Sequence, residues 1–135
     1  MRTVMTLGTF DLFHRGHLSI LRRSLELGDR LIVGVATDRY VRDEKGVIPV
    51  YSQDDRLELI SRIVYVKGAY LFDSFDQLPE MLEFYTVDIL TMGSDWEGKL
   101  DRYLSICKVI YLPRTTGISS TELRELVSLP NMVTS

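Results

Sequence analysis

The two histidines of the chain, His14 and His17, are its clearest candidates for chemistry, because they lie close together after a glycine-bearing segment. Residues spaced by three can face the same side of a helix start, where free backbone amides and the helix dipole favour bound phosphate. Gly16 between them leaves room for a bulky group, and Gly8 would let the backbone approach a ligand closely. The segment therefore predicts a phosphate-binding site, although either histidine alone could equally be a helix cap or a surface residue.

A second stretch with similar chemistry lies near the C-terminus, where Arg114 precedes a run rich in hydroxyl side chains that extends to Thr121. Ser119 and Glu122 fit a capping box at the start of a helix. The box does not account for the remaining hydroxyls or for Arg114, whose guanidinium can bind phosphate oxygens bidentately. We interpret the stretch as a phosphate cradle at a helix N-terminus.

The apolar pattern predicts the elements that position these residues. Near-continuous apolar runs, typical of strands covered on both faces, occur at Thr3–Leu7, Arg30–Ala36, Val87–Met92, Lys108–Leu112 and, more weakly, Tyr65–Phe72. Helical patterns occur at Gly16–Leu27, Gln53–Ile63, Leu78–Tyr85 and Ser119–Leu129, and the least regular stretch is Arg42–Gln53. Strands that alternate with helices predict an α/β fold, namely a single Rossmann-like domain whose five-stranded parallel sheet is covered by helices on both faces.

Composition narrows the classes of protein to which the chain can belong. Its 135 residues suffice for one domain with a core, which we expect over residues 1–130, followed by a flexible tail at 131–135. The net charge of -3 argues against nucleic-acid binding, which usually needs a basic surface. The single cysteine, Cys107, cannot form an internal disulfide, and no cluster of Cys and His suggests zinc. The sequence contains no signal-peptide pattern or long apolar run, so we expect a cytoplasmic protein without membrane insertion.

The residues around the histidines resemble a known family. His14-Arg15-Gly16-His17 matches the His-x-Gly-His signature of the nucleotidyltransferase superfamily, and the longer string that begins at Gly8 resembles its cytidylyltransferase branch. The stretches Gly93–Lys99 and Arg114–Thr121 are similar to segments of the glycerol-3-phosphate cytidylyltransferases. The resemblance covers nearly the whole chain. It implies transfer of a nucleotide from CTP to a small phosphorylated alcohol, with glycerol 3-phosphate as the best guess, and release of pyrophosphate.

The resemblance also implies a role for each site residue. His14, His17, Lys45 and Arg114 would stabilise charge on the phosphates, and Arg56 would bind the acceptor together with Lys45. The residues expected to hold the nucleotide are Gly8, Thr9, Phe10, Asp11, Gly16, Asp95, Thr115, Gly117, Ile118, Ser119, Ser120 and Thr121. A Mg²⁺ ion would bridge the phosphates, mainly through substrate oxygens and water. A homodimer is implied by the family in the same way.

Two departures from the family pattern leave the acceptor open. Val64-Tyr65-Val66-Lys67 stands where members commonly have Arg-Tyr-Val-Asp, and Val47 stands where they often have a second lysine. Two alternatives therefore remain for the function. One is an adenylyltransferase that uses ATP with a sugar-phosphate or coenzyme-precursor acceptor, and the other is a non-catalytic nucleotide-binding module.

Overall fold

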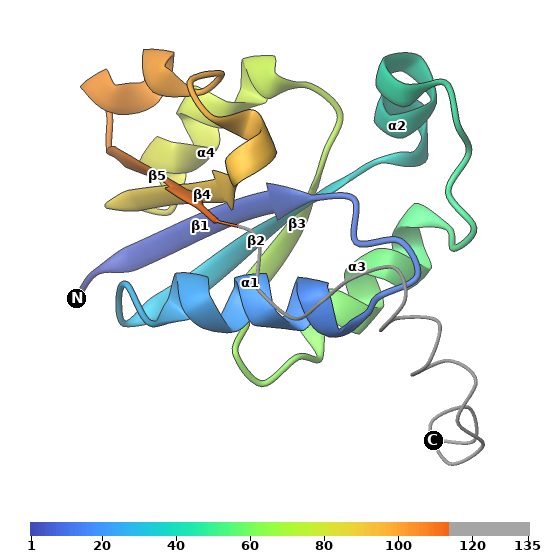
Figure 1. Ribbon diagram of the computed structural model, residues 1–135, viewed down its shortest axis with the longest axis horizontal. Helices are drawn as coiled ribbons and strands as arrows, with labels where there is room; N and C mark the ends of the chain where they lie inside the picture. Colours follow the sequence, from blue (N-terminus) through green and yellow to red (C-terminus); the bar gives the residue numbers. More distant parts are fainter. Residues whose placement is uncertain (114–135) are drawn as a thin grey trace.

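A computed structural model describes residues 1–113 of the chain, and a five-stranded parallel sheet forms the centre of this part (Figure 1). The strands are β1 (Thr3–Gly8), β2 (Arg30–Ala36), β3 (Gly68–Phe72), β4 (Ile89–Gly93) and β5 (Lys108–Leu112). Their order in the sheet is β3-β2-β1-β4-β5, and every neighbouring pair is parallel. The chain order reverses between β1 and β4, and ligands of such sheets bind at the carboxyl ends of the strands beside that point.

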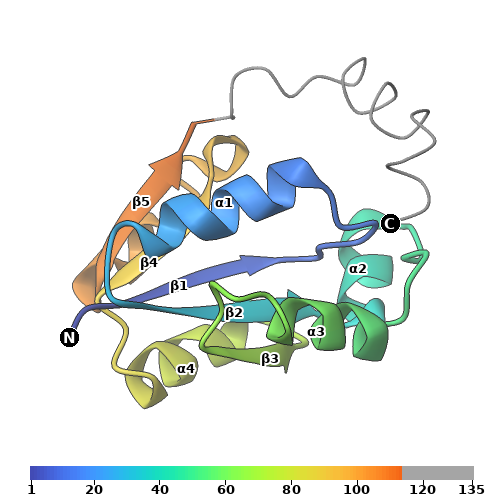
Figure 2. The same ribbon diagram turned by 90° about the horizontal axis from the view of Figure 1, so that it is seen from below.

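Helices cover both faces of the sheet, which confirms the predicted fold class. The α-helices within residues 1–113 are α1 (Arg15–Leu25), α2 (Asp38–Lys45), α3 (Gln53–Ser61) and α4 (Leu78–Phe84), and the 3-10 segments are η1 (Phe75–Gln77), η2 (Ser94–Trp96) and η3 (Asp101–Ser105). Figure 2 shows α1 and α4 on opposite sides of the sheet. None of these helices is long and apolar enough to cross a bilayer.

Alternate residues of the central strand enter two apolar clusters on the two faces. Val4 packs in one cluster with Leu21 of α1 and Ile60 of α3, whereas its neighbour Met5 packs in the other cluster with Leu82 of α4. All five side chains are at most 1% exposed. Because successive strand residues point to opposite faces, a strand buried on both sides is apolar throughout. This arrangement explains why the strands show little alternation in sequence.

Three buried hydroxyls join β1, β4 and α1 at the place where the chain order reverses. The Thr6 Oγ1 donates a hydrogen bond to the Thr91 carbonyl oxygen at 2.9 Å, and the hydroxyls of Ser24 and Thr91 share another at 2.7 Å. All three residues are at most 1% exposed. Buried hydroxyls cost free energy unless they are paired, so this network fixes α1 against the two central strands.

The elements predicted within residues 1–113 all form, and most of them have shifted ends. The weak strand predicted from Tyr65 begins only at Gly68, after a turn in which the Val66 amide donates to the Ile63 carbonyl. The predicted helix Ser119–Leu129, the domain end at residue 130 and the tail 131–135 lie outside the described residues.

The sequence does not predict α2, which occupies the first part of the stretch that we expected to be irregular. Thr37 caps this helix by accepting a hydrogen bond from the Tyr40 amide, and Gly46 ends it with a φ of 70°. Val41 is the buried residue of α2. A short helix with one buried side chain has no apolar period, so its local caps are the only signal that it leaves in the sequence.

Candidate active site

A cleft of about 400 Å³ opens at the carboxyl ends of β1 and β4, where the sheet topology places a ligand. It brings together predicted site residues that are distant in sequence, namely Gly8, Thr9, Phe10, Asp11, His17, Lys45 and Asp95. Helix α2 follows β2, and η2 follows β4, so these two elements lie on opposite sides of β1. They form the two side walls of the cleft.

The loop after β1 has a backbone conformation that non-glycine residues rarely adopt. Phe10 and Leu12 have φ values of 56° and 48°, in the left-handed region. The Phe10 ring is 5% exposed and meets the His17 ring edge-on, with centroids 5.5 Å apart. A Cβ on Gly8 would lie 2.8 Å from the Phe10 ring. Phe10 thus borders the cleft while its largely buried side chain supports His17.

Both histidines cap the first turn of α1 through their Nδ1 atoms. The His14 Nδ1 accepts a hydrogen bond from the Gly16 amide at 3.0 Å, and the His17 Nδ1 accepts one from the His14 amide at 3.2 Å. A neutral imidazole that accepts at Nδ1 carries its proton on Nε2. Each ring therefore retains an Nε2–H donor. The amides of Gly16 and His14, which we expected to be free for phosphate, are already paired with the rings.

The two imidazoles are uncharged near neutral pH in the free protein. Their rings stack with centroids 3.9 Å apart and an interplanar angle of 24°. Burial, and then the neighbouring His14, lower the pKa of His17 to about 4, although Asp11 acts in the opposite direction. Burial also lowers the pKa of His14. The pair consequently meets an incoming anion as two hydrogen-bond donors and not as two cations.

Asp11 borders the cleft, but both of its carboxylate oxygens are engaged. They accept hydrogen bonds from the backbone amides of Val50 at 2.8 Å and Tyr51 at 3.0 Å. Burial alone would raise the pKa of Asp11, but these bonds, one from the Leu12 amide and the charge of Arg56 lower it overall. Asp11 is thus an ionised group that orders the connection between α2 and α3.

Arg56 does not lie where the acceptor-binding prediction requires it. Its side chain is 1% exposed, and its guanidinium donates to the carbonyl oxygens of Tyr51, Thr9 and Ala36 and to the Asp38 carboxylate. A guanidinium enclosed by four protein oxygens has no accessible face for a substrate. We correct its role from acceptor ligand to internal bridge between the ends of β1 and β2.

Lys45 and Asp95 bring opposite charges to the two walls of the cleft. The Lys45 Nζ reaches the cleft from the last turn of α2 and lies 3.4 Å from the Thr9 Oγ1. Asp95 borders the cleft from η2, and no other residue within 1–113 makes a hydrogen bond or ion pair with its carboxylate. Trp96 beside it also borders the cleft while its ring stacks on Phe75, with centroids 5.5 Å apart. Trp96 therefore packs against the protein, as a single tryptophan usually does, and also lines the cleft.

The remaining predicted residues divide into two groups. Gly16 lies in the first turn of α1 and acts through its amide, as described above. The phosphate cradle expected near the C-terminus lies outside the described residues, and it comprises Arg114, Thr115, Gly117, Ile118, Ser119, Ser120 and Thr121.

Comparison with known proteins identifies the family. Residues 5–126 match the cytidylyltransferase-like family. The chain is 38% identical over 128 residues to the glycerol-3-phosphate cytidylyltransferase of Bacillus subtilis (strain 168), with 95% of this chain and 98% of the relative covered. The chain belongs to the cytidylyltransferase-like family. It is accordingly a nucleotidyltransferase enzyme.

Other relatives of this cytidylyltransferase-like protein are named for different activities. It is 39% identical over 124 residues to the FAD synthase of Thermoplasma acidophilum, with 87% of this chain and 86% of that relative covered. The crystal structure of the lipopolysaccharide core biosynthesis protein from Thermoplasma volcanium GSS1 superposes with a TM-score of 0.76 and 31% identity, over 85% of this chain and 98% of that one. The family thus fixes the fold and the class of reaction, but its members differ in substrate.

Sequence reasoning missed one wall of the cytidylyltransferase-like cleft. Val47, Ile48 and Pro49 border the cleft beside Lys45. Their signal was a run of apolar residues, extending to Tyr51, inside a stretch that otherwise looked irregular. The carboxylate of Asp38, which pairs with Arg56, was also missed because an acidic residue at a helix start is ordinarily a surface group.

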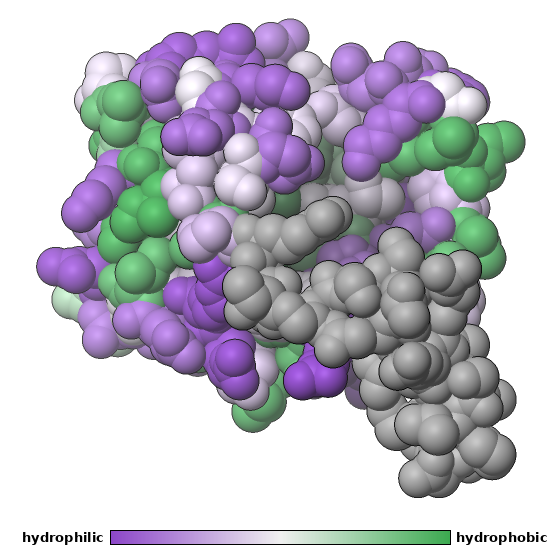
Figure 3. Space-filling model, in the orientation of Figure 1, coloured by the Kyte–Doolittle hydropathy of each residue, from purple (hydrophilic) through white to green (hydrophobic). Residues whose placement is uncertain are grey.

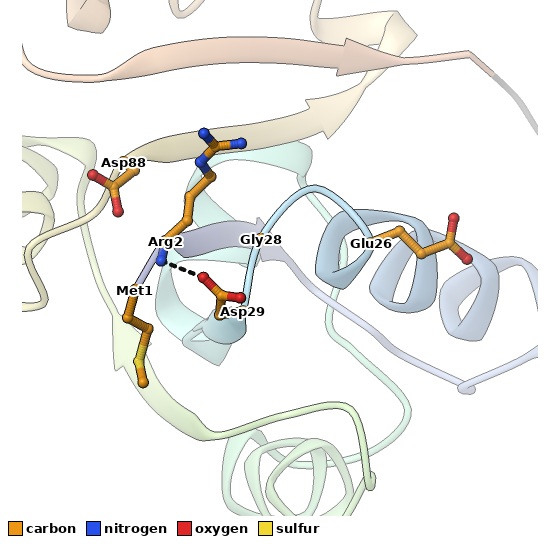
Figure 4. Close-up of a pocket in the computed structure, with 6 residues that line it drawn as sticks. All are labelled: Met1, Arg2, Glu26, Gly28, Asp29 and Asp88. Carbon is orange, nitrogen blue, oxygen red and sulfur yellow. Dashed lines mark hydrogen bonds between the residues drawn. The ribbon is translucent and has the colours of Figure 1, made fainter.

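A second cavity, of about 560 Å³, lies at the opposite edge of the sheet and is lined by Met1, Arg2, Glu26, Gly28, Asp29 and Asp88. Figure 4 shows the Arg2 amide bonded to Asp29 while the Arg2 guanidinium points away from that carboxylate. Asp88 accepts a hydrogen bond from the Thr3 amide in the same way. These carboxylates pair with the first amides of β1, so the cavity records how the strand begins and gathers none of the signature residues.

Proposed function

We propose that this enzyme transfers a cytidylyl group from CTP to the phosphate of a small phosphorylated alcohol, with glycerol 3-phosphate as the first candidate. The single observation that carries the proposal is the pair of imidazole Nε2–H donors set by the cap of α1, of which His17 lines the cleft and His14 stacks on His17. The similarity over nearly the full length to a glycerol-3-phosphate cytidylyltransferase supports the choice of substrates.

In the proposed reaction, an oxygen of the acceptor phosphate forms a bond to the α-phosphorus of CTP. The bond between that phosphorus and the oxygen that bridges to the β-phosphate breaks, and pyrophosphate leaves with the bonding electrons. The acceptor oxygen is already anionic, so the enzyme needs no strong general base. The work of the protein is to position two polyanions and to stabilise the charge that develops on the α-phosphate and the leaving group.

The described residues can supply these functions from three directions. His14 and His17 donate hydrogen bonds to phosphate oxygens from the cap of α1 without carrying charge of their own. Lys45 adds one positive charge from α2. Asp95, on the opposite wall, accepts hydrogen bonds from the ribose hydroxyls. We therefore place the nucleoside on the η2 side of the cleft and the phosphates beside His17.

A Mg²⁺ ion fits this donor set as a partner of the substrate. Within residues 1–113 no group of three or more His, Cys, Asp or Glu side chains could hold a metal ion. The Asp11 oxygens are both paired, which leaves Asp95 as the cleft carboxylate that could reach an ion or its water. Mg²⁺ binds through one or two carboxylates plus substrate phosphates and water. When bound, it would neutralise phosphate charge during transfer.

Adenylyl transfer is the second candidate function, because the similarity to an FAD synthase also covers most of the chain. A pyrophosphate-release assay separates the two. CTP or ATP would be tested against glycerol 3-phosphate, a sugar phosphate and flavin mononucleotide, each with Mg²⁺. Release that requires CTP and glycerol 3-phosphate supports the proposal, whereas release that requires ATP and another acceptor replaces it with the second candidate.

The family resemblance also leads us to propose a homodimer that acts in the cytoplasm. Light scattering of the purified protein at assay concentration measures the mass in solution against the 15.5 kDa of one chain. A mass of one chain under conditions of full activity would contradict the dimer.

A further inference from the structure

The connection between α2 and α3 forms part of the cleft wall, but apolar packing does not hold it in place. The exposed fractions of Val47, Ile48, Val50 and Tyr51 are 55%, 77%, 69% and 50%. Figure 3 shows hydrophobic side chains gathered on the molecular surface along this connection. A segment whose apolar side chains point into solvent gains little from burial. Its position must therefore come from its backbone hydrogen bonds.

Two charged side chains make those hydrogen bonds, and both of them bond to the backbone of Tyr51. Asp11 accepts from the amides of Val50 at 2.8 Å and Tyr51 at 3.0 Å. The Arg56 Nε donates to the Tyr51 carbonyl oxygen at 3.0 Å. The amide and the carbonyl of Tyr51 are thus each paired with an ionised group, and hydrogen bonds to charged groups are about twice as strong as neutral ones.

The same two side chains tie the connection to the ends of the central strands. The Arg56 Nη1 donates to the carbonyl oxygens of Thr9 at 2.8 Å and Ala36 at 2.7 Å, and its Nη2 pairs with Asp38 at 2.6 Å. Asp11 itself lies in the loop after β1, three residues before His14. These hydrogen bonds therefore fix the position of the chain between Lys45 and Ser52 relative to the loop after β1 and the end of β2.

We propose that Asp11 and Arg56 are positioning residues that hold the Val47–Tyr51 connection as the acceptor-side wall of the cleft, without contacting either substrate. This inference rests on the proposed function, because it concerns where the acceptor binds. Asp95 and α2 lie on opposite sides of β1, and His17 of α1 also lines the cleft. A nucleoside on the Asp95 side and phosphates beside His17 leave the α2 side, with Lys45 and the Val47–Tyr51 connection, for the acceptor.

The test compares Asp11→Asn with Glu58→Gln. Asp11→Asn keeps the shape of the side chain but removes the charge and turns an amide nitrogen toward one of the two backbone amides. Glu58→Gln makes the same chemical change on the exposed face of α3, where the carboxylate pairs with Arg62 one turn away. We expect Asp11→Asn to raise the KM for the acceptor by about tenfold or more and to leave the KM for CTP within about threefold of wild type. Glu58→Gln leaves both unchanged.

Amide hydrogen exchange provides a second measurement that does not depend on turnover. In Asp11→Asn, the amides of Val50 and Tyr51 should exchange about tenfold faster or more, while amides of the core strands keep their protection. Arg56→Lys retains a charge but cannot reach the Tyr51, Thr9 and Ala36 carbonyls together, so it should show the same split between the two KM values if it folds.

Each other outcome overturns the inference. An unchanged acceptor KM or unchanged exchange at Val50 and Tyr51 in folded Asp11→Asn shows that the connection is held by something else. Equal rises in both KM values show a general structural role. If the wild-type enzyme transfers no cytidylyl group to any acceptor, the proposed function fails, and the exchange measurement alone then decides whether the two side chains hold the connection.

Discussion

The Nδ1 atom of His17 accepts a hydrogen bond from the backbone amide of His14 at 3.2 Å, so the two signature histidines share one helix cap. A cap residue and a phosphate ligand are usually regarded as competing roles for a side chain at a helix start. Here the Nδ1 of each ring caps the helix, and the Nε2 of each ring keeps its hydrogen, with His17 lining the cleft. The capping bond selects the Nε2–H tautomer that the proposed reaction would use.

Replacement of His17 separates capping from catalysis. His17→Ala should lower kcat by about a hundredfold or more, the order found when one preorganised donor is lost, while the protein stays folded. His17→Gln should restore the cap, because glutamine at this position of a capping box can accept from the cap amide, but it should not restore kcat. Steady-state kinetics and thermal unfolding of both variants test this. A glutamine variant with wild-type kcat would contradict the role of the imidazole.

Stability should depend on pH through His17. The pKa of this residue is about 4 in the folded protein, against an ordinary value of 6.5. Between these two values the unfolded chain binds more protons than the folded one, so the free energy of unfolding falls as the pH drops from about 6.5 towards 4. His14, whose pKa burial also lowers, acts in the same direction.

We expect the loss attributable to His17 to be of the order of 1–3 kcal/mol. Urea unfolding at a series of pH values measures it. The slope of stability against pH in this window should be smaller in His17→Gln than in wild type. Identical slopes would show that His17 is not held neutral by its surroundings.

Arg56 should be the charged residue in α3 whose removal costs most stability. Arg56→Ala removes a buried guanidinium from three backbone carbonyls and from the Asp38 carboxylate, which is 40% exposed and keeps the Gln53 amide, and the unpaired carbonyls should cost about 3 kcal/mol. Arg62→Ala, at the C-cap of α3, removes an exposed pair with Glu58 and should change stability by no more than about 0.5 kcal/mol. Chemical denaturation of the two variants provides the comparison. Equal effects would contradict the bridge that we describe.

Lys45 should affect turnover and not folding. Its side chain is exposed, and its contact in the cleft is the Thr9 hydroxyl at 3.4 Å. Lys45→Ala should lower kcat/KM by about tenfold or more through loss of a charge near the phosphates, with the midpoint of thermal unfolding unchanged. Lys67→Ala is the matched control, because that lysine is also exposed and precedes β3 at the far edge of the sheet. Equal kinetics in the two variants would exclude Lys45 from the site.

The sequence predicted those parts of the fold that local pattern determines. Strands such as Arg30–Ala36 are apolar throughout because they are buried on both faces, and their boundaries agree with the structure. The position of the segment from Gly8 to His17 followed from the rule that ligands bind at the carboxyl ends of central parallel strands, whereas Lys45 and Asp95 were assigned to the site from the family resemblance. The structure brings His17 and Asp95 to one cleft although they are distant in sequence.

Tertiary pairing was less predictable, and Arg56 shows why. An arginine in a helix is normally exposed, and the partners that make its burial possible belong to three other segments. A local signal existed, because Arg56 lies four residues before the buried Ile60 and thus on the inward stripe of α3. Asp11 was similarly ambiguous, since nothing near it in sequence indicates that the amides of Val50 and Tyr51 would meet it.

The buried hydroxyls of Ser24, Thr6 and Thr91 show which parts of the molecule can change in sequence and which cannot. They fasten α1, and therefore the histidine pair, to the two innermost strands without using the α2–α3 connection. Substitutions or insertions in that connection can then reshape the acceptor-side wall of the cleft while the histidine pair keeps its position. An engineer who wished to give this scaffold a new acceptor would diversify residues 47–51 first and leave the three hydroxyls untouched.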